Sequence, residues 1–206
     1  MSMERVILAS ASPRRAELLR AAGIEFDVMP ADTDETVHPG DTPEAYVRRV
    51  AEAKALAVIA RANGRPVLAA DTVVVVDGAI LGKPADREDA RRMLRLLSGR
   101  AHEVLTAVCL SGGPEGGVPA APARWGAVAR PTLTRVESTT VEFAALTEDD
   151  INWYAATGET DDKAGAYAIQ GLGSRFVTRI SGSYSNVVGL PVSLVFQMFG
   201  SAGLRS

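Results

Sequence analysis

The 206-residue sequence has one cysteine, Cys109, no excess of positive charge and no long apolar run. A single cysteine can form neither an internal disulfide nor a zinc cluster, so we expect Cys109 to be a core residue in a reducing compartment. A net charge of −3 argues against a nucleic acid polymer as partner. No run approaches the ~20 apolar residues of a spanning helix, and the apolar stretch at 6–9 is too short for a signal peptide. We therefore expect a soluble, cytoplasmic protein with no membrane partner.

Two common catalytic signatures are also missing from the sequence. It contains neither the G-x-S-x-G motif of a nucleophilic serine nor the G-x-x-x-x-G-K-[ST] motif of a phosphate-binding loop. Its two histidines, His38 and His102, have no visible nucleophile partner. We expect both histidines to be bystanders.

Strand and helix patterns alternate along most of the chain, which predicts an α/β protein. The turn signal at Asp77 and Gly78 predicts a hairpin, so the twisted sheet must be mixed, with flanking helices. The length suits one domain over 1–206, and residues 111–131, rich in glycine, proline and alanine, predict a flexible surface loop. The patterns predict strands at 5–10, 24–30, 67–76, 79–84, 102–110, 136–146, 166–171 and 175–182, and helices at 12–23, 42–64, 86–99, 147–158 and 190–200.

The predicted strand VLAADTVVVV, residues 67–76, is apolar on both sides of one acid, Asp71, which Thr72 follows. An unpaired carboxylate in an apolar interior carries a large free-energy penalty. Asp71 must therefore have a partner, which can be a cation, a metal ion or a set of hydrogen-bond donors.

The segment LASASPRRAELL predicts a strand, a tight turn and a helix whose first turn carries Arg14 and Arg15. A helix start already favours anions, so two arginines there oppose the helix dipole unless an anion joins them. Phosphate matches the guanidinium fork, and Ser10 can add a hydroxyl. The alternative is a solvated basic patch at the end of a helix.

Four further residues complete a candidate set. Lys54 falls in the apolar stripe of a predicted helix, where it either meets an anion or extends to solvent. Lys83 precedes a proline at the end of the hairpin strand, and Gln170 lies among glycines with an amide suited to reading a base. Glu35, in an acidic loop, can join Asp71 as an oxygen ligand for magnesium or manganese. Together these residues suit a polyphosphate with a metal and a base, although each alone also fits a solvated surface.

Several motifs in order resemble the Maf family of nucleoside triphosphate pyrophosphatases. They are LASASPRRAELL, DETV, AEAKA, AADTVVVVDGAILGKP, LSGRAHEVLTAVCL, TTVEF and DKAGAYAIQGLGSRFVTRISGSYSNVVGLP. The resemblance implies a mixed α/β fold with two lobes around a cleft, often dimeric, and related to the inosine triphosphate pyrophosphatases. It implies hydrolysis of a nucleoside triphosphate to the monophosphate and pyrophosphate, with a divalent metal cation, Mg or Mn.

The resemblance also implies roles for individual residues. Asp71 matches the proposed catalytic base, and Glu35 matches an acid near the metal and substrate. The phosphate-handling positions are matched by Ser10, Arg14, Arg15, Lys54 and Lys83, and the positions tied to substrate choice by Arg14, Thr72 and Gln170. Glutamine at 170 favours the subfamily acting on dTTP and UTP, because an amide can meet both the donor and the acceptor of a uracil or thymine edge. The subfamily acting on 7-methyl-GTP carries a glutamate there.

Three other functions stay open at this level. The family name refers to inhibition of septum formation, so the protein could bind a nucleotide and regulate cell division without turnover. It could act on 7-methyl-GTP, or release orthophosphate as a general phosphatase. The segment 111–131 is longer than the family pattern leads us to expect.

Overall fold

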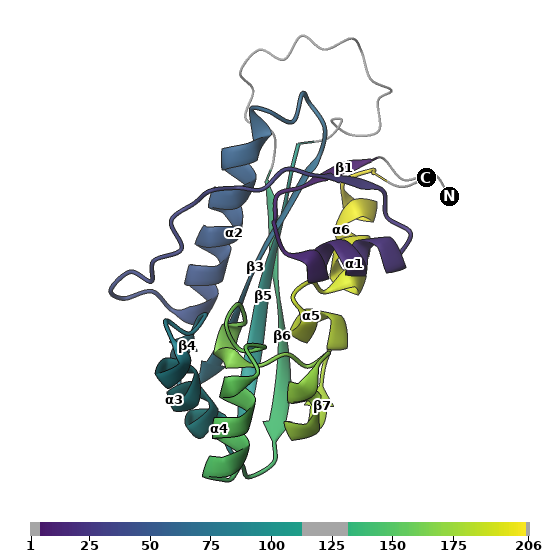
Figure 1. Ribbon diagram of the computed structural model, residues 1–206. Coiled ribbons are helices and arrows are strands. Elements are labelled where there is room, and N and C mark those ends of the chain that lie inside the picture. The colour runs from purple at the N-terminus through teal and green to yellow at the C-terminus, as the bar shows by residue number, and fades with distance from the viewer. Residues whose placement is uncertain (1–4, 113–131, 205–206) are drawn as a thin grey trace.

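The computed structural model describes residues 5–112 and 132–204. One mixed sheet runs in the order β2-β1-β3-β5-β6-β7, with β4 beside β3, and helices flank it (Figure 1). This confirms the α/β class and the mixed sheet. The strands are β1 (Val6–Leu8), β2 (Phe26–Val28), β3 (Val67–Val76), β4 (Ala79–Leu81), β5 (Ala101–Ser111), β6 (Leu133–Phe143) and β7 (Val177–Ser181). The helices are α1 (Pro13–Ala21), α2 (Pro43–Ile59), α3 (Arg87–Leu97), α4 (Glu148–Ala156), α5 (Tyr184–Val188) and α6 (Val192–Ser201), with 3₁₀ turns η1 (Ala164–Ala166) and η2 (Leu172–Phe176).

The two edges of β3 are paired differently. Along one edge, β5 runs antiparallel to β3 from Val67 to Val75. On the other edge, β1 is parallel and pairs only as far as Leu68, whereas β4 is antiparallel and pairs only from Val74 onward. Among the described residues, positions 69–73 of β3 therefore have no strand partner on this edge. The gap lies beside Asp71, at the carboxyl end of β1, where α/β sheets place ligands.

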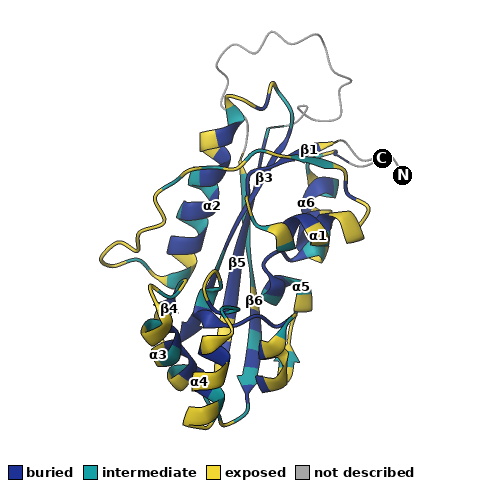
Figure 2. Ribbon diagram, viewed as in Figure 1, coloured by how far each residue is buried: buried dark blue, intermediate teal, exposed yellow. Residues whose placement is uncertain are grey.

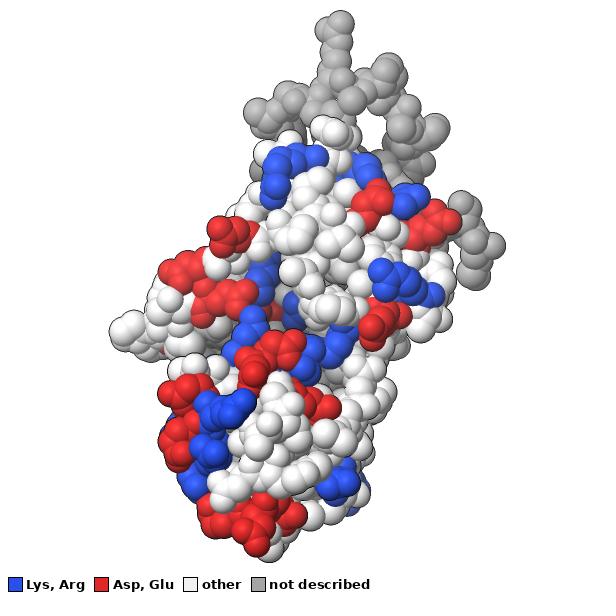
Figure 3. Space-filling view, in the orientation of Figure 1, with Lys and Arg blue, Asp and Glu red and all other residues white. Residues whose placement is uncertain are grey.

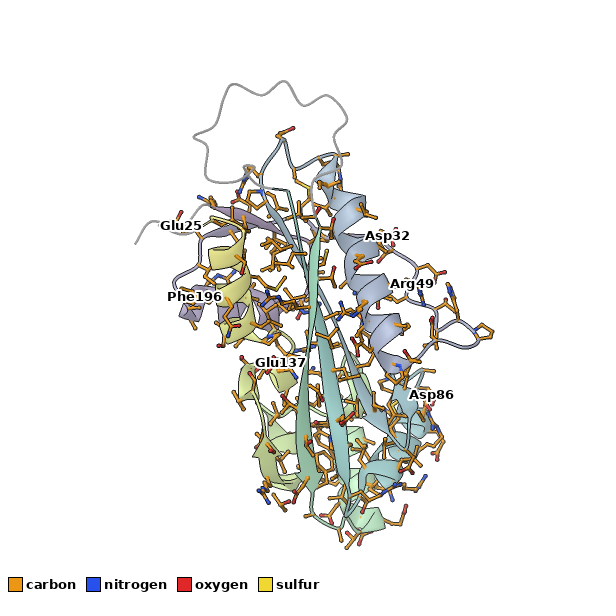
Figure 4. The ribbon with its side chains drawn as sticks, turned by 180° about the vertical axis from the view of Figure 1, so that it is seen from behind. Glu25, Asp32, Arg49, Asp86, Glu137 and Phe196 are labelled. Atoms are coloured by element: carbon orange, nitrogen blue, oxygen red, sulfur yellow. The ribbon has the colours of Figure 1, made fainter. Side chains whose placement is uncertain are left out.

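Three apolar clusters divide the molecule into two lobes joined by the long strands β3, β5 and β6. In the upper lobe of Figure 1, one cluster packs α2 on one face of the sheet and another packs α1 and α6 on the opposite face. In the lower lobe, a third cluster packs α3, α4 and η1. The side of α2 that faces the sheet is buried and its outer side is exposed (Figure 2). Seen from behind, α2, which carries Arg49, and α6, which carries Phe196, flank the long strands (Figure 4).

The pleat of β3 sends its side chains alternately to the two faces. Val67, Ala69 and Val73 pack in the cluster around α2, whereas Leu68 and Ala70 pack in the cluster around α1 and α6. Neighbouring residues at the gap follow the same alternation. Asp71 therefore lies on the α2 face, where it meets Lys54, and Thr72 lies on the opposite face, where it meets Arg15.

The strand predicted at 166–171 is wrong. Its first residue, Ala166, belongs to η1 and has a φ of 60°, and Gly165 has a φ of 69°. These left-handed conformations break an extended chain. The backbone then turns, because the amide of Gly171 donates to the carbonyl of Ala168 at 3.3 Å. The apolar run at 166–169 therefore lies in a buried turn and not in a strand.

The segments on either side also differ from prediction. The strand expected at 175–182 is shortened to β7, because η2 occupies its first residues. The short helix α5 was not predicted. Of the loop predicted at 111–131, Ser111 is the last residue of β5, and residues 113–131 lie outside the described part of the chain.

Two expectations from composition can be compared with the structure. Cys109 is fully buried in β5, and burial raises the pKa of its thiol to about 11, which confirms a core residue. No helix within residues 5–112 and 132–204 is long and apolar enough to cross a membrane. The cytoplasmic location stays a prediction.

His102 is a buried histidine in the core of the lower lobe. Its side chain packs edge-on against the rings of Phe143 and Tyr167, and its Nε2 shares a hydrogen bond of 2.9 Å with the Tyr167 hydroxyl. Burial lowers the pKa of His102 to about 4. The imidazole is therefore neutral at physiological pH, as a structural histidine should be.

This burial predicts a pH-dependent stability. His102 of the unfolded chain binds a proton near pH 6.5, whereas the folded protein binds it only near pH 4. The unfolded state therefore binds more protons between these values, and stability that is complete above pH 6.5 is lost as the pH falls toward 4. Between pH 7 and 4, we expect the free energy of unfolding to fall by about 3 kcal/mol more in the wild type than in His102→Gln.

Urea denaturation over this pH range measures the difference. His38→Gln is the matched control, because His38 is exposed and should leave the wild-type slope intact. A His102→Gln variant with the wild-type slope would contradict the assignment.

The lower-lobe core also predicts unequal effects of the same substitution at two leucines. Leu94 of α3 is fully buried, whereas Leu56 of α2 is 63% exposed. Leu94→Ala leaves a cavity and should lower the free energy of unfolding by about 2–5 kcal/mol. Leu56→Ala should change it by less than about 0.5 kcal/mol. Equal losses in chemical denaturation would refute this view of the core.

Candidate active site

A cleft of about 530 Å³ opens at the gap in the sheet, between the two lobes. Acidic and basic side chains gather midway along the molecule, where the two lobes meet (Figure 3). The cleft is bounded by the turn after β1, the start of α1, the middle of β3 and the segment that follows α4. All the residues predicted for the site line it: Ser10, Arg14, Arg15, Glu35, Lys54, Asp71, Thr72, Lys83 and Gln170.

Asp71 is buried because its partner is a cation. The ammonium of Lys54 donates to Asp71 Oδ1 at 2.7 Å and lies 2.7 Å from Glu35 Oε1. The side chains of Lys54 and Asp71 are only 9% and 8% exposed, whereas Glu35 is 41% exposed. Lys54 thus meets two carboxylates and does not extend to solvent. Asp71 Oδ2 accepts no hydrogen bond from the described part of the chain, which leaves it free for a ligand or a water.

Arg15 is a buried cation that touches no carboxylate among the described residues. Its Nε donates to the carbonyl of Gly189 at 2.8 Å, one terminal nitrogen donates to Ser10 Oγ at 3.1 Å, and the other donates to Thr72 Oγ1 at 3.0 Å. Burial lowers the pKa of Arg15, although the nearby charges of Asp71 and Glu35 oppose that shift. These bonds use three of the five guanidinium N–H groups. The remaining donors and the charge are available to an anion.

Thr72 belongs to the framework that holds Arg15. Its hydroxyl lies 2.9 Å from Thr106 Oγ1 and 3.4 Å from the carbonyl of Gly189, in addition to its bond with Arg15. Thr106 in turn donates to the carbonyl of Asn186 at 3.3 Å. Adjacent strands and the end of α5 therefore fix the guanidinium in one position.

Arg14 and Lys83 are less constrained than Arg15 and Lys54. Arg14 donates to Asp162 Oδ2 at 3.0 Å. Because Arg14 lies in the first turn of α1 whereas Asp162 follows α4, this ion pair joins the two lobes across the cleft. Lys83 is 64% exposed and lies 3.9 Å from Glu35 Oε2. Each of these pairs has at least one exposed side chain and is weaker than a buried pair, so a bound anion can take the place of either carboxylate.

Gln170 lies at the cleft on the turn between η1 and η2. Its side chain is exposed and makes no hydrogen bond within residues 5–112 and 132–204. The amide is thus free to pair with a ligand from this wall of the cleft.

Tyr46 and Lys163 also line the cleft and were not singled out from the sequence. The Tyr46 hydroxyl donates to the carbonyl of Glu35 at 2.8 Å. Burial, with the charges of Asp71 and Glu35, raises the pKa of Tyr46 to about 12, so the hydroxyl remains a donor. Lys163 pairs with Asp162. It lies inside the DKAGAY motif, which was the available signal, whereas Tyr46 carried none beyond the apolar stripe of its helix.

The charge of the cleft is opposite to that of the whole chain. Its described lining contains five cations, Arg14, Arg15, Lys54, Lys83 and Lys163, and three carboxylates, Glu35, Asp71 and Asp162. The resulting net charge is +2, in a chain whose net charge is −3. A cleft with low-dielectric walls focuses such a field, so this site favours an anionic ligand.

A divalent metal fits this site only in part. No group of three or more histidine, cysteine or acidic side chains that could hold a metal occurs in the described ranges. Glu35 and Asp71 are nevertheless close enough to share Lys54, and magnesium is often held by one or two carboxylates together with substrate phosphates and water. The residues therefore suit a cation that arrives with a polyphosphate.

Comparison with known proteins gives consistent relatives. The family model described as Maf-like protein matches residues 5–202. A dTTP/UTP pyrophosphatase from Anaeromyxobacter sp. (strain Fw109-5) is 55% identical over 97% of this chain and 90% of its own length. Another from Anaeromyxobacter dehalogenans (strain 2CP-C) is 52% identical over 97% of this chain and 94% of its own. A solved structure, that of the Staphylococcus aureus Ham1 protein, has a TM-score of 0.49 and 14% identity, covering 96% of this chain and 99% of that one.

The family model spans nearly all of the sequence, and these curated relatives share more than half of their aligned residues with it. The chain therefore belongs to the family of Maf-like proteins.

Proposed function

We propose that this protein hydrolyses dTTP and UTP to the monophosphate and pyrophosphate. The observation that carries the proposal is the buried Lys54 between Asp71 and Glu35, next to Arg15, whose charge has no contacting carboxylate among the described residues. This arrangement supplies cations for phosphate oxygens and an acid beside them. The names of the relatives, dTTP/UTP pyrophosphatase, support the same reaction.

The cations of the cleft bind the triphosphate. Arg15 offers a fixed guanidinium, and Lys54 offers a buried ammonium. Arg14 and Lys83 are more exposed, so each can exchange its carboxylate partner for a phosphate oxygen. Ser10 keeps its hydroxyl against Arg15 and thus helps to hold that guanidinium in place. As charge shifts toward the leaving pyrophosphate, preorganised cations of this kind lower the barrier.

Asp71 acts on the attacking water. The water oxygen forms a bond to the α-phosphorus, the bond between this phosphorus and the oxygen of the leaving pyrophosphate breaks, and the proton passes to Asp71. Its Oδ2 is the oxygen for this step, because Oδ1 already accepts from Lys54. Lys54 therefore orients the acid as well as binding phosphate.

Glu35 and Asp71 are the residues that would hold a divalent cation, Mg or Mn, which would neutralise phosphate charge and polarise the bond to be broken. Tyr46 helps to fix the position of Glu35, because its hydroxyl donates to the backbone carbonyl of Glu35. A homodimer, as the resemblance implies, stays a prediction.

Substrate choice falls mainly to Gln170. An amide offers both a donor and an acceptor, which complement a uracil or thymine edge, whereas a guanine edge presents neighbouring N–H donors that suit a carboxylate. Arg14 lies within the same cleft and can contact the nucleotide. Thr72 acts through Arg15, because its hydroxyl is already bonded to that guanidinium and to Thr106.

The proposed reaction predicts which products are released. Incubated with magnesium or manganese, the pure protein should release pyrophosphate from dTTP and UTP, and at least about tenfold less from CTP, GTP and 7-methyl-GTP at equal concentration. Separation of pyrophosphate from orthophosphate is the measurement.

Each other result favours an alternative. Turnover mainly of 7-methyl-GTP would overturn the role given to Gln170. Orthophosphate as the product would indicate a general phosphatase. Tight binding of a nucleotide without turnover would favour a regulator of cell division.

The role given to Asp71 makes a separate prediction. Asp71→Asn keeps the shape of the side chain but removes the base, so kcat for UTP should fall by a factor of about 10²–10⁴. Asp77→Asn is the matched control. Asp77 directly follows β3, but its side chain is exposed and pairs with Arg100. Asp77→Asn should retain the wild-type kcat. Normal turnover by Asp71→Asn would refute the assignment of the base.

A further inference from the structure

The turn that presents Gln170 is held by residues that do not line the cleft in the described structure. The amide of Gly171 donates to the carbonyl of Ala168, which closes a tight turn around residues 169 and 170. Gln170 is exposed at this turn, whereas Ala168 before it and Gly173 after it are buried. The direction in which Gln170 points therefore depends on what holds the two ends of the turn.

Both ends are held by one pair of side chains, Tyr154 and Glu159. The amide of Ala168 donates to the Tyr154 hydroxyl at 3.0 Å. The amides of Leu172 and Gly173 each donate to a different oxygen of Glu159, at 3.0 Å. The Tyr154 hydroxyl donates to Glu159 Oε2 at 2.7 Å, so the two contacts form one continuous network.

The turn also packs directly on these groups. A Cβ on Gly173 would lie 2.6 Å from the Tyr154 hydroxyl and 2.8 Å from the carbonyl of Ala168. A Cβ on Gly171 would lie 1.8 Å from Glu159 Oε1. The glycines of this segment thus allow the backbone to approach the carboxylate and the phenol closely enough to bond.

Glu159 is suited to this role because it stays ionised. Its partial burial acts to raise the pKa, but hydrogen bonds from Tyr154, Gly173 and Leu172 outweigh burial and lower the pKa of Glu159. A carboxylate can accept from all three donors at once, and hydrogen bonds to a charged acceptor are stronger than neutral ones.

We propose that Glu159 is a positioning residue for base selection, which acts through Tyr154 and the backbone of residues 168–173 to aim Gln170 at the base in the cleft. This inference rests on the proposed function, because it takes Gln170 as the group that reads the base. It extends the specificity determinants beyond the cleft, to a carboxylate that follows α4.

The test is the selectivity of Glu159→Gln. The amide has a single acceptor oxygen, so it cannot accept from both backbone amides and the phenol. We expect the ratio of kcat/KM for UTP to that for GTP to fall about tenfold, mainly through a higher KM for UTP, while kcat for UTP changes less than about twofold. A loss of stability alone would lower activity toward both nucleotides and leave this ratio unchanged.

Glu148→Gln is the matched control. Glu148 lies at the start of α4, and its carboxylate pairs with Arg95 at 2.9 Å and contacts no residue of the turn among those described. It should keep the wild-type ratio. If Glu159→Gln does not fold, Tyr154→Phe is measured in its place, since it removes only the hydroxyl that joins Ala168 to Glu159. We expect the same direction of change.

A double-mutant cycle with Gln170→Ala tests whether Glu159 acts through the glutamine. In the Gln170→Ala background, Glu159→Gln should change the selectivity ratio by less than about twofold. A full, additive loss in that background would overturn the inference.

The remaining outcomes separate this inference from the proposed function. Suppose that the wild type prefers UTP and that Gln170→Ala loses this preference. If Glu159→Gln then keeps the preference, only the inference is overturned. If Gln170→Ala keeps the preference, the inference and the role of Gln170 fall together, but the hydrolysis stands. A wild type that releases no pyrophosphate from UTP or dTTP overturns the proposed function itself.

Discussion

The ion pair between Lys54 and Asp71 is the interaction on which the rest of the site depends. Each charge is buried, and each would be strongly unfavourable without the other. Lys54 comes from α2 and Asp71 from β3, so the pair exists only because α2 packs across the sheet at that height. Glu35 completes the arrangement from the acidic loop. Removing one partner of such a buried pair typically destabilises a protein by about 3–5 kcal/mol, which ties the chemistry of the site to the stability of the fold.

The gap in the sheet explains why this pair can also reach a ligand. A strand paired on both edges and covered on both faces would enclose Asp71 completely. Here β1 stops at Leu8 and β4 begins its pairing opposite Val74, so the middle of β3 opens to the cleft. The site is therefore buried enough to strengthen electrostatic interactions and open enough to admit a nucleotide.

The cations that line the cleft fall into two groups that differ in burial. Arg15 and Lys54 are buried and fixed by several bonds, whereas Arg14 and Lys83 are more exposed and paired with carboxylates at the surface. The two buried cations provide preorganised charge, and the two more exposed cations can exchange their carboxylate partners for an anion that enters the cleft. On the other wall, Gln170 makes no hydrogen bond among the described residues, whereas Tyr154 and Glu159 behind it hydrogen-bond to each other and to the backbone of the turn.

The sequence by itself determined the class of fold, the order of most elements and the residue types of the site. Hydrophobic periodicity and turn residues are local signals, so the long strand at 67–76, its hairpin and α2 could be predicted from them. The resemblance to the Maf family rested on ordered motifs that are likewise written along the chain. A buried acid in an apolar strand was enough to show that Asp71 must have a partner.

Only the tertiary structure showed that the partner of Asp71 is Lys54. Lys54 and Asp71 are 17 residues apart, and Arg14 and Asp162 are 148 apart, so both pairs depend on how helices and loops pack around the sheet. The same is true of Arg15, whose neutral acceptors come from three separate segments, and of the turn at 168–171, which was predicted as part of a strand from a short apolar run. Side-chain alternation along a chain is visible in a sequence, whereas hydrogen bonds between distant segments arise only when packing brings their donors and acceptors together.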